Sequence, residues 1–199
     1  MGNKDSNTPL APLFGLVLNG GGSRRMGRPK GDLTVGSESL RERARRTLRG
    51  VADPVWESVG DREVDAPYFV RDLRPGAGPL AGLHAAQEAC PDAAWLVLAV
   101  DLPAVTPALL TRLVQARRAD AAAVAFAGEE QFEPACAIYE PLSRPRVLEQ
   151  IERGDYSLWR VLAAVNTVRL THPGEALRNI NTPDEWRRYC ASGGGPQSA

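Results

Sequence analysis

Between residues 18 and 30 the chain combines clustered glycines with basic side chains, in the segment LNGGGSRRMGRPK. The segment follows an apolar run, LFGLVL at 13–18, that predicts a buried strand. A glycine-rich turn after a strand lets backbone N–H groups converge on a phosphate, because glycine has no Cβ to keep the ligand away. Arg25 offers a planar fork of donors and Lys30 a mobile positive charge. The segment therefore predicts a site for a polyphosphate.

Two common phosphate-binding patterns do not fit this segment. A dinucleotide fingerprint, G-x-G-x-x-G, would use Gly20 and Gly22, but its third glycine would be Arg25, a poor residue for close packing of helix and strand. A Walker loop could run from Gly22 to Gly27, but neither Lys nor Ser or Thr follows directly. A glycine-rich turn with incidental basic residues is a structural alternative, which leaves Arg25 and Lys30 without an explanation.

The loop has the pattern Leu18-x-Gly20-Gly21-x-Ser23-x-Arg25-Met26-Gly27-x-x-Lys30. This pattern resembles the signature loop of the nucleotidyltransferases that activate a phosphomonoester with a nucleoside triphosphate, most closely that of the molybdenum cofactor guanylyltransferases. The resemblance implies catalytic roles for Arg25, which would hold the triphosphate, and Lys30, which would stabilise charge developing at the α-phosphate. It also implies nucleotide contacts for Leu18, Asn19, Gly20, Gly21, Gly22, Ser23, Arg25, Met26, Gly27 and Lys30.

Asp101 ends an apolar run in VLAVDLPAV at 97–105. The following segment, TPALLTRLVQA at 106–116, predicts a helix with Thr106 as its N-cap and Pro107 in its first turn. Asp101 is therefore expected at the carboxyl end of a strand, where open α/β sheets bind ligands. An aspartate in this place can also serve only as a turn or capping residue. The resemblance implies instead that Asp101 is catalytic and binds Mg²⁺, the expected cofactor.

Two more segments stand in the order typical of the family. Gly78, Pro79 and Leu80, in PGAGPLAGL at 75–83, match a family segment in which a helix begins close to the nucleotide. Asp72 aligns with a residue with which the family recognises the base, since a carboxylate accepts hydrogen bonds from amino and ring N–H groups. A solvated loop residue is an equal alternative for Asp72.

The segment RNINTPDEW at 178–186 contains two asparagines before a helix start. Thr182, Pro183 and Glu185 predict a capping box, which accounts for half of the motif without any function. Capping does not account for Asn179 and Asn181. The resemblance implies that these two residues lie beside a pterin substrate.

The resemblance extends from about Phe14 to Trp186. It implies transfer of GMP from GTP to the terminal phosphate of molybdopterin or molybdenum cofactor, with release of pyrophosphate. GTP and the cofactor are the implied partners, and molybdoenzymes or other cofactor-synthesis proteins are further partners that the resemblance allows. A cytidylyltransferase acting on the same cofactor, a non-catalytic accessory protein and a sugar-phosphate transferase stay open as alternatives. Asn19 and Ser58 depart from the family pattern, which usually has Ala at the first position and in some members Asn at the second.

Short apolar runs alternate with helical patterns, which is typical of βαβ units. Strands are expected at 13–18, 53–59, 67–70, 94–100, 121–127 and 165–170, and helices at 40–48, 80–89, 106–116, 144–151 and 157–163. The arginines of 41–49 are expected on a solvated helix face. Segment 129–142 predicts a hairpin or an edge strand, with Glu129, Glu130 and Glu133 at a solvated tip. We therefore expect an α/β fold, a single-domain Rossmann-like three-layer sandwich whose mostly parallel sheet has an antiparallel edge, of the nucleotide-diphospho-sugar transferase type.

Composition limits the partners and the compartment. The 199 residues include 24 Lys and Arg and 24 Asp and Glu, so no overall field attracts nucleic acid or an anionic membrane, and neither is expected as a partner. Three cysteines, far apart and without a CxxC pair, indicate neither a disulfide framework nor a zinc site and favour the cytoplasm. Residues 1–12 are expected to form a disordered tail, 13–191 the nucleotidyltransferase domain and 192–199 a flexible tail.

Overall fold

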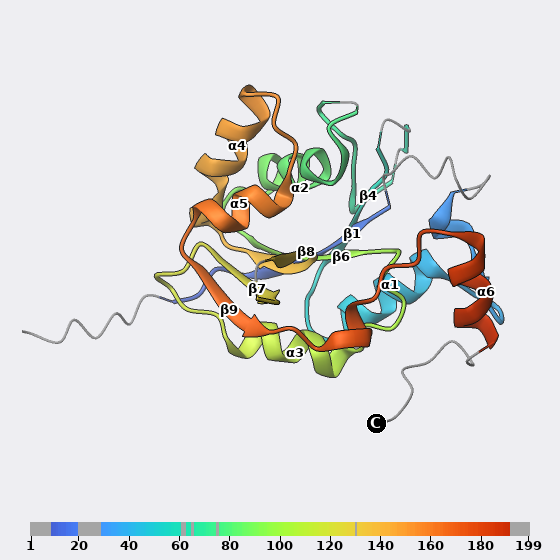
Figure 1. Cartoon of the computed structure of the whole chain (residues 1–199). Coiled ribbons are helices and arrows are strands. Elements are labelled where there is room, and N and C mark those ends of the chain that lie inside the picture. Colours follow the sequence, from blue (N-terminus) through green and yellow to red (C-terminus); the bar gives the residue numbers. More distant parts are fainter. Residues whose placement is uncertain are drawn as a thin grey trace, which may run out of the picture.

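The computed structural model of the chain describes residues 9–19, 29–60, 63–64, 66–74, 76–129 and 131–191. A seven-stranded sheet forms its centre, in the order β5-β4-β1-β6-β8-β7-β9 (Figure 1). The strands are β1 (Leu13–Leu18), β4 (Val55–Ser58), β5 (Phe69–Val70), β6 (Ala94–Ala99), β7 (Ala123–Ala127), β8 (Phe132–Tyr139) and β9 (Thr167–Thr171). A separate antiparallel pair is formed by β2 (Thr34–Val35) and β3 (Glu38–Ser39).

Helices cover both faces of the sheet, as expected for a three-layer sandwich (Figure 1). One layer contains α2 (Gly78–Ala89), α4 (Arg144–Glu152) and α5 (Leu158–Ala164), and the other contains α1 (Leu40–Arg49) and α3 (Pro107–Gln115). Beside α1 lies α6 (Pro183–Ala191), and three short 3-10 helices, η1 (Lys30–Asp32), η2 (Pro141–Ser143) and η3 (Gly174–Leu177), connect other elements. Within the described part of the chain, no helix has both the length and the apolar character needed to cross a membrane.

The two apolar layers are separated by the alternation of side chains along the strands. In β1, Leu16 and Leu18 pack into the cluster formed with α2, α4 and α5, whereas Val17 packs into the cluster formed with α1 and α3. In β6, Trp95 packs into the first of these clusters and Leu96 into the second. A strand covered by helices on both faces has a continuous apolar sequence, which is what LFGLVL and AWLVLAV show. The expected α/β class is confirmed.

The predicted helix starts are formed by side-chain caps. The Thr106 hydroxyl accepts a hydrogen bond from the Leu109 N–H (3.3 Å) at the start of α3. Before α6, the Thr182 hydroxyl accepts from the Glu185 N–H (3.2 Å), and Glu185 Oε2 accepts from the Thr182 N–H (2.9 Å). These bonds satisfy first-turn donors that have no partner inside the helix. The N-cap and the capping box read from the sequence are both confirmed.

The antiparallel strand of the sheet is β8, which runs opposite to both β6 and β7. It forms the expected hairpin with β7 but lies between β6 and β7, whereas the outer strands β5 and β9 run parallel to their neighbours. Residues Cys136–Tyr139 are fully buried because helices cover both faces there. Glu133 consequently lies on a paired strand and is only partly exposed. The prediction that it lies at a solvated hairpin tip is therefore wrong.

The described part of the expected N-terminal tail, residues 9–12, leads directly into β1. The Pro12 carbonyl accepts a hydrogen bond from the Ala94 N–H (2.9 Å), and the Ala11 carbonyl accepts one from Arg117 Nη2 (2.7 Å). Residues 1–8 and 192–199, which the sequence assigns to tails, lie outside the described residues.

Candidate active site

The carboxyl ends of β1 and β6 lie side by side where the strand order reverses. Along the chain, β4 and β5 are added on one side of β1, and β6 is then added on its other side. Open α/β sheets bind ligands outside such a switch point, because the loops that follow the two strands diverge there. Asn19 directly follows β1, and Asp101 lies two residues after β6. Both residues therefore lie where a ligand is expected.

Three residues predicted from separate motifs meet at this edge. Lys30 Nζ donates hydrogen bonds to Asp101 Oδ2 (3.1 Å) and to Asn181 Oδ1 (2.6 Å). Lys30 belongs to η1, Asp101 to the turn after β6, and Asn181 to the segment before α6. The side chains of Lys30 and Asp101 are 19% and 23% exposed, so a ligand in solution can reach both charges. Their catalytic roles stay predictions, but the fold brings the charges together.

Backbone contacts hold Asn181 in this position. The Ile180 N–H donates to the Asp101 carbonyl (2.9 Å), and Ile180 itself is buried. Glu185 Oε2 accepts from the Asn181 N–H (2.8 Å) as well as from the capping residue before α6. The hydrogen bond from the Asn181 N–H is the largest cause of a lowered pKa of Glu185, so the charged form makes the contact. The segment is thus tied to the Asp101 turn at one end and to α6 at the other.

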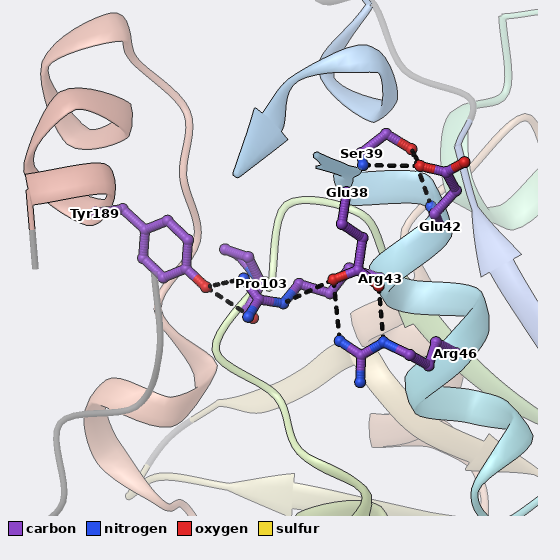
Figure 2. Close-up of polar contacts among 7 residues, drawn as sticks. All are labelled: Glu38, Ser39, Glu42, Arg43, Arg46, Pro103 and Tyr189. Atoms are coloured by element: carbon purple, nitrogen blue, oxygen red, sulfur yellow. Dashed lines mark hydrogen bonds and ion pairs between the residues drawn. The ribbon is translucent and has the colours of Figure 1, made fainter. Parts of the chain in front are cut away.

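Tyr189 holds α6 against α1 and the Asp101 turn (Figure 2). Its hydroxyl donates to the Pro103 carbonyl (3.0 Å) and accepts from Arg43 Nη1 (2.9 Å). Glu38 lies 3.9 Å from Arg43 Nε and forms two shorter bonds with Arg46, of 2.7 and 3.0 Å. No residue of α6 is fully buried, so these polar contacts add to the packing of the partly buried Trp186 against the core in attaching the helix.

Asp72 lies on the segment after β5 and is 9% exposed. Ser58, the last residue of β4, donates from its hydroxyl to Asp72 Oδ1 (3.1 Å), and the Asp72 N–H donates to the Gly60 carbonyl (2.8 Å). The alternative of a solvated loop residue is therefore wrong. A carboxylate held in this way still offers acceptor lone pairs to a ligand, so recognition of a base stays a compatible prediction.

Gly78–Leu80 form the start of α2, close to the ends of β1 and β4. A Cβ on Gly82 would lie 2.5 Å from Ser58 Oγ and 3.1 Å from Leu18 Cδ2, so only glycine allows this approach. The N-cap residue, Ala77, has no side-chain cap for the first turn. First-turn N–H groups of a helix are suitable partners for an anion.

The remaining predicted residues divide into two groups. Leu18 is buried at the end of β1, and its carbonyl accepts a hydrogen bond from the Val100 N–H (3.3 Å), so the predicted nucleotide contact would involve its backbone. Asn179 is partly exposed, two residues before Asn181. The structure does not describe the rest of the predicted phosphate loop, namely Gly20, Gly21, Gly22, Ser23, Arg25, Met26 and Gly27.

Glu57 is a buried carboxylate that the sequence analysis did not identify as part of the site. It lies in β4 with no exposed surface, accepts from Asn19 Nδ2 (2.8 Å) and lies 3.4 Å from Arg45 Nη1. Arg45 also lies over the ring of Phe69, 5.2 Å from its centroid. This arginine is therefore not on a purely solvated helix face. An acidic residue inside the apolar run PVWES was the available signal for Glu57.

Glu133 is a second carboxylate near the site. Burial raises its pKa, a hydrogen bond from the Ala135 N–H (3.1 Å) lowers it, and the negative charge of Asp101 raises it. The pairing of Leu98 with Cys136 explains this proximity, since the same antiparallel register continues toward Asp101 and Glu133. The register of β8 depends on tertiary packing, so no local pattern in the sequence predicts it.

The oxygen atoms of the site are suited to a hard cation. Asp101 Oδ2 and Asn181 Oδ1 both already face the ammonium group of Lys30, which shows that they present negative potential to a common point. Carboxylate and amide oxygens fit Mg²⁺, which usually binds one or two protein groups together with substrate phosphates and water. Among the residues that the structure describes, no group of three His, Cys, Asp or Glu forms a metal cage. The residues present fit a magnesium ion shared with a substrate.

Comparison with known proteins agrees with this geometry. A family model described as the MobA-like NTP transferase domain matches residues 15–170. A probable molybdenum cofactor guanylyltransferase from Opitutus terrae is 37% identical over 193 residues, covering 93% of this chain and 92% of that protein. A molybdenum cofactor guanylyltransferase from Pseudomonas fluorescens is 30% identical over 188 residues, covering 90% and 94%.

Solved structures show the same fold. Molybdopterin-guanine dinucleotide biosynthesis protein A from Archaeoglobus fulgidus has a TM-score of 0.76 at 24% identity, covering 90% of this chain and 97% of that chain. The 2-C-methyl-D-erythritol 4-phosphate cytidylyltransferase from Thermus thermophilus has a TM-score of 0.64 at 20% identity, covering 89% and 96%. The nucleotidyltransferase type expected for the fold is thus confirmed.

Proposed function

Because the chain belongs to the MobA-like NTP transferase family, we propose that it transfers GMP from GTP to the terminal phosphate of molybdopterin or its molybdenum form. The chain is a nucleotidyltransferase, and its relatives carry the name molybdenum cofactor guanylyltransferase. The observation that supports the proposal most directly is the meeting of Lys30, Asp101 and Asn181 at the switch point of the sheet. A cation and two oxygen ligands converge there from three distant segments.

In the proposed reaction, an oxygen of the cofactor's terminal phosphate attacks the α-phosphorus of GTP. The bond between the α-phosphorus and the oxygen that bridges to the β-phosphate breaks, and its electron pair leaves with pyrophosphate. The reactants are both anionic, so positioning and charge neutralisation supply most of the acceleration. In the proposal, Lys30 donates to an oxygen of the α-phosphate as charge develops, which the partial exposure of its side chain at this edge supports.

The other residues have supporting roles in the proposal. Asp101 would bind Mg²⁺, with Asn181 Oδ1 as an adjacent oxygen. The metal would supply neutralisation of phosphate charge. Asp72 would accept hydrogen bonds from the guanine N–H groups, with its orientation supported by Ser58. Asn179 and Asn181 would contact the pterin substrate, and Arg25, outside the described residues, would hold the triphosphate.

The test measures pyrophosphate release from each of the four nucleoside triphosphates, with Mg²⁺ and a cofactor preparation of demonstrated activity. We expect turnover with GTP, and losses of about a hundredfold or more for Lys30→Ala and Asp101→Asn. Asn166→Ala is the matched control, because Asn166 is exposed and donates to the Asp120 carbonyl (2.9 Å), outside the site. Selectivity for CTP would replace the proposal by the cytidylyltransferase. Absence of turnover with every nucleotide would leave a binding protein.

A further inference from the structure

Asn19, the first residue after β1, has a side chain that the protein holds from two sides. On one side its Nδ2 donates to Glu57 Oε1 (2.8 Å), and this carboxylate has no exposed surface. Arg45 lies 3.4 Å from the other carboxylate oxygen and balances the buried charge. Moving Asn19 would therefore leave a buried acceptor without its partner, which is costly inside a protein. The contact anchors Asn19 to the interior of β4.

On the other side, the Asn19 side chain fills the space beside Gly31. A Cβ built on Gly31 would lie 2.8 Å from Asn19 Cγ, 2.9 Å from its Nδ2, and still closer to its Oδ1. Gly31 is buried and is not one of the described glycines with positive φ, so its backbone conformation does not require glycine. The proximity of the Asn19 amide is what excludes a side chain at this position.

Lys30 is the direct neighbour of Gly31 in η1, so the packing of Asn19 on Gly31 also sets the place of Lys30. We propose that Asn19 is a positioning residue: anchored by Glu57, it fixes η1 against the end of β1 and so places Lys30 beside Asp101 and Asn181. The effect on turnover rests on the proposed function, whereas the effect on the position of Lys30 does not. The Asn19 amide nitrogen donates to Glu57 and its oxygen lies against Gly31, so the proposal assigns Asn19 to positioning rather than to selection of the base.

The contact with Gly31 is tested by a double-mutant cycle on stability. Gly31→Ala is expected to lower the urea midpoint, because the new methyl group collides with the Asn19 amide. In the Asn19→Ala background, where the amide is absent, the same Gly31→Ala change is expected to lower the midpoint much less. Gly128→Ala is the matched control, since the nearest heavy atom to a Cβ there lies 3.9 Å away. Strictly additive losses for Gly31→Ala and Asn19→Ala would overturn the proposed packing.

The anchor is tested by exchanging donor and acceptor. Asn19→Asp places a carboxylate against Glu57 and is expected to be more harmful than Asn19→Ala. Adding Glu57→Gln to Asn19→Asp restores a hydrogen bond of opposite direction with the same net charge. This double variant is expected to recover most of the turnover that Asn19→Asp loses. Failure of this exchange, in a variant that is folded by circular dichroism, would contradict the anchor.

The position of Lys30 is read without any turnover. The chain contains only two lysines, Lys4 and Lys30, so the rate of reductive methylation at Lys30 relative to Lys4 is measured directly by mass spectrometry. An ammonium group held between Asp101 and Asn181 reacts slowly, and Asn19→Ala is expected to raise the ratio several-fold, with the exchange variant near the wild-type value. An unchanged ratio in Asn19→Ala would overturn the proposal.

Kinetics separate positioning from base selection. We expect kcat for Asn19→Ala to fall about ten- to a hundredfold, as for a displaced catalytic group, with KM for GTP and the preference for GTP over CTP within about twofold of wild type. A changed preference with unchanged kcat would show that Asn19 reads the base and would overturn the proposal. If the wild-type protein has no turnover, the proposed function fails, and the labelling ratio decides on Asn19 alone.

Discussion

Replacing Tyr189 by Phe is expected to loosen α6 while leaving the rest of the fold intact. The change removes a hydroxyl that donates to the Pro103 carbonyl (3.0 Å) and accepts from Arg43 (2.9 Å), and it preserves the ring. The ring still packs beside Trp186, with 6.1 Å between centroids. No residue of α6 is completely buried, and its apolar contact with the core is made by the partly buried Trp186, so the Tyr189 hydroxyl contributes a substantial part of its attachment. The helix follows directly after Asn181, so its attachment affects the site.

The size of the effect follows from the partners that are lost. A neutral hydrogen bond contributes about 0.5–1.5 kcal/mol net, and one to a charged group about 1.5–3 kcal/mol. Arg43 keeps its contact with Glu38 and is 22% exposed, so water and Glu38 recover part of the second bond. We therefore expect a loss of about 1–2 kcal/mol in the free energy of local opening, which corresponds to roughly 5- to 30-fold.

Hydrogen exchange read by mass spectrometry measures this change. Amides of 184–191, together with that of Asn181, are expected to exchange roughly 5- to 30-fold faster in Tyr189→Phe, while amides of α3 keep their rates. Tyr156→Phe is the matched control, because Tyr156 is exposed and lies outside this contact. An unchanged rate in α6, or an equal increase in α3, would refute the reasoning that the Tyr189 hydroxyl holds this helix.

Three further predictions concern the core and the pH dependence. Arg117 forms two hydrogen bonds with Glu140, of 2.6 and 3.0 Å, and the Glu140 side chain is only 5% exposed. Arg117→Met is expected to cost about 3–5 kcal/mol in the free energy of unfolding measured in urea, because it leaves Glu140 as an unpaired buried charge. Adding Glu140→Leu should recover most of that loss. Gly82→Ala is expected to cost about 1–3 kcal/mol through the collision with Ser58, and Ser58→Gly should relieve it in the same assay. Burial lowers the pKa of His84 below its ordinary value of 6.5, so the unfolded state binds the proton first and stability falls as the pH drops through 6.5 toward the folded pKa. His84→Gln should therefore reduce the fall in the urea midpoint between pH 7.5 and pH 5.5, and an identical fall in the variant would contradict this assignment.

The elements with clear local signals were predictable. The runs LFGLVL and AWLVLAV became the central strands β1 and β6, because a strand buried on both faces needs apolar residues at every position. Thr106, Thr182 and Glu185 marked helix starts, since capping depends on residues three positions apart. Asp101 was placed correctly after a strand, because the order of strand and helix along the chain determines which end of the strand it occupies.

The antiparallel strand was predictable as a hairpin but not in its position. Pairing of β8 with β7 depends on a short connection, which the sequence shows, whereas its insertion beside β6 depends on contacts between segments about forty residues apart. This register places Glu133 near Asp101 and buries it, contrary to the expected solvated tip. No local sequence pattern predicts such a contact, because the hairpin alone does not determine which strand of the sheet β8 will pair with.

By itself, the sequence determined the class of the fold, the residues that could take part in chemistry and the family of the chain, because each of these depends on residue types at short spacing. Only the tertiary structure decided which of these residues meet. Lys30 and Asn181 are 151 positions apart and lie within 2.6 Å, and Asn19 and Glu57, 38 positions apart, form a buried contact. Such pairs are fixed by the packing of whole elements against the sheet, where the burial of apolar surface sets positions that no local pattern encodes.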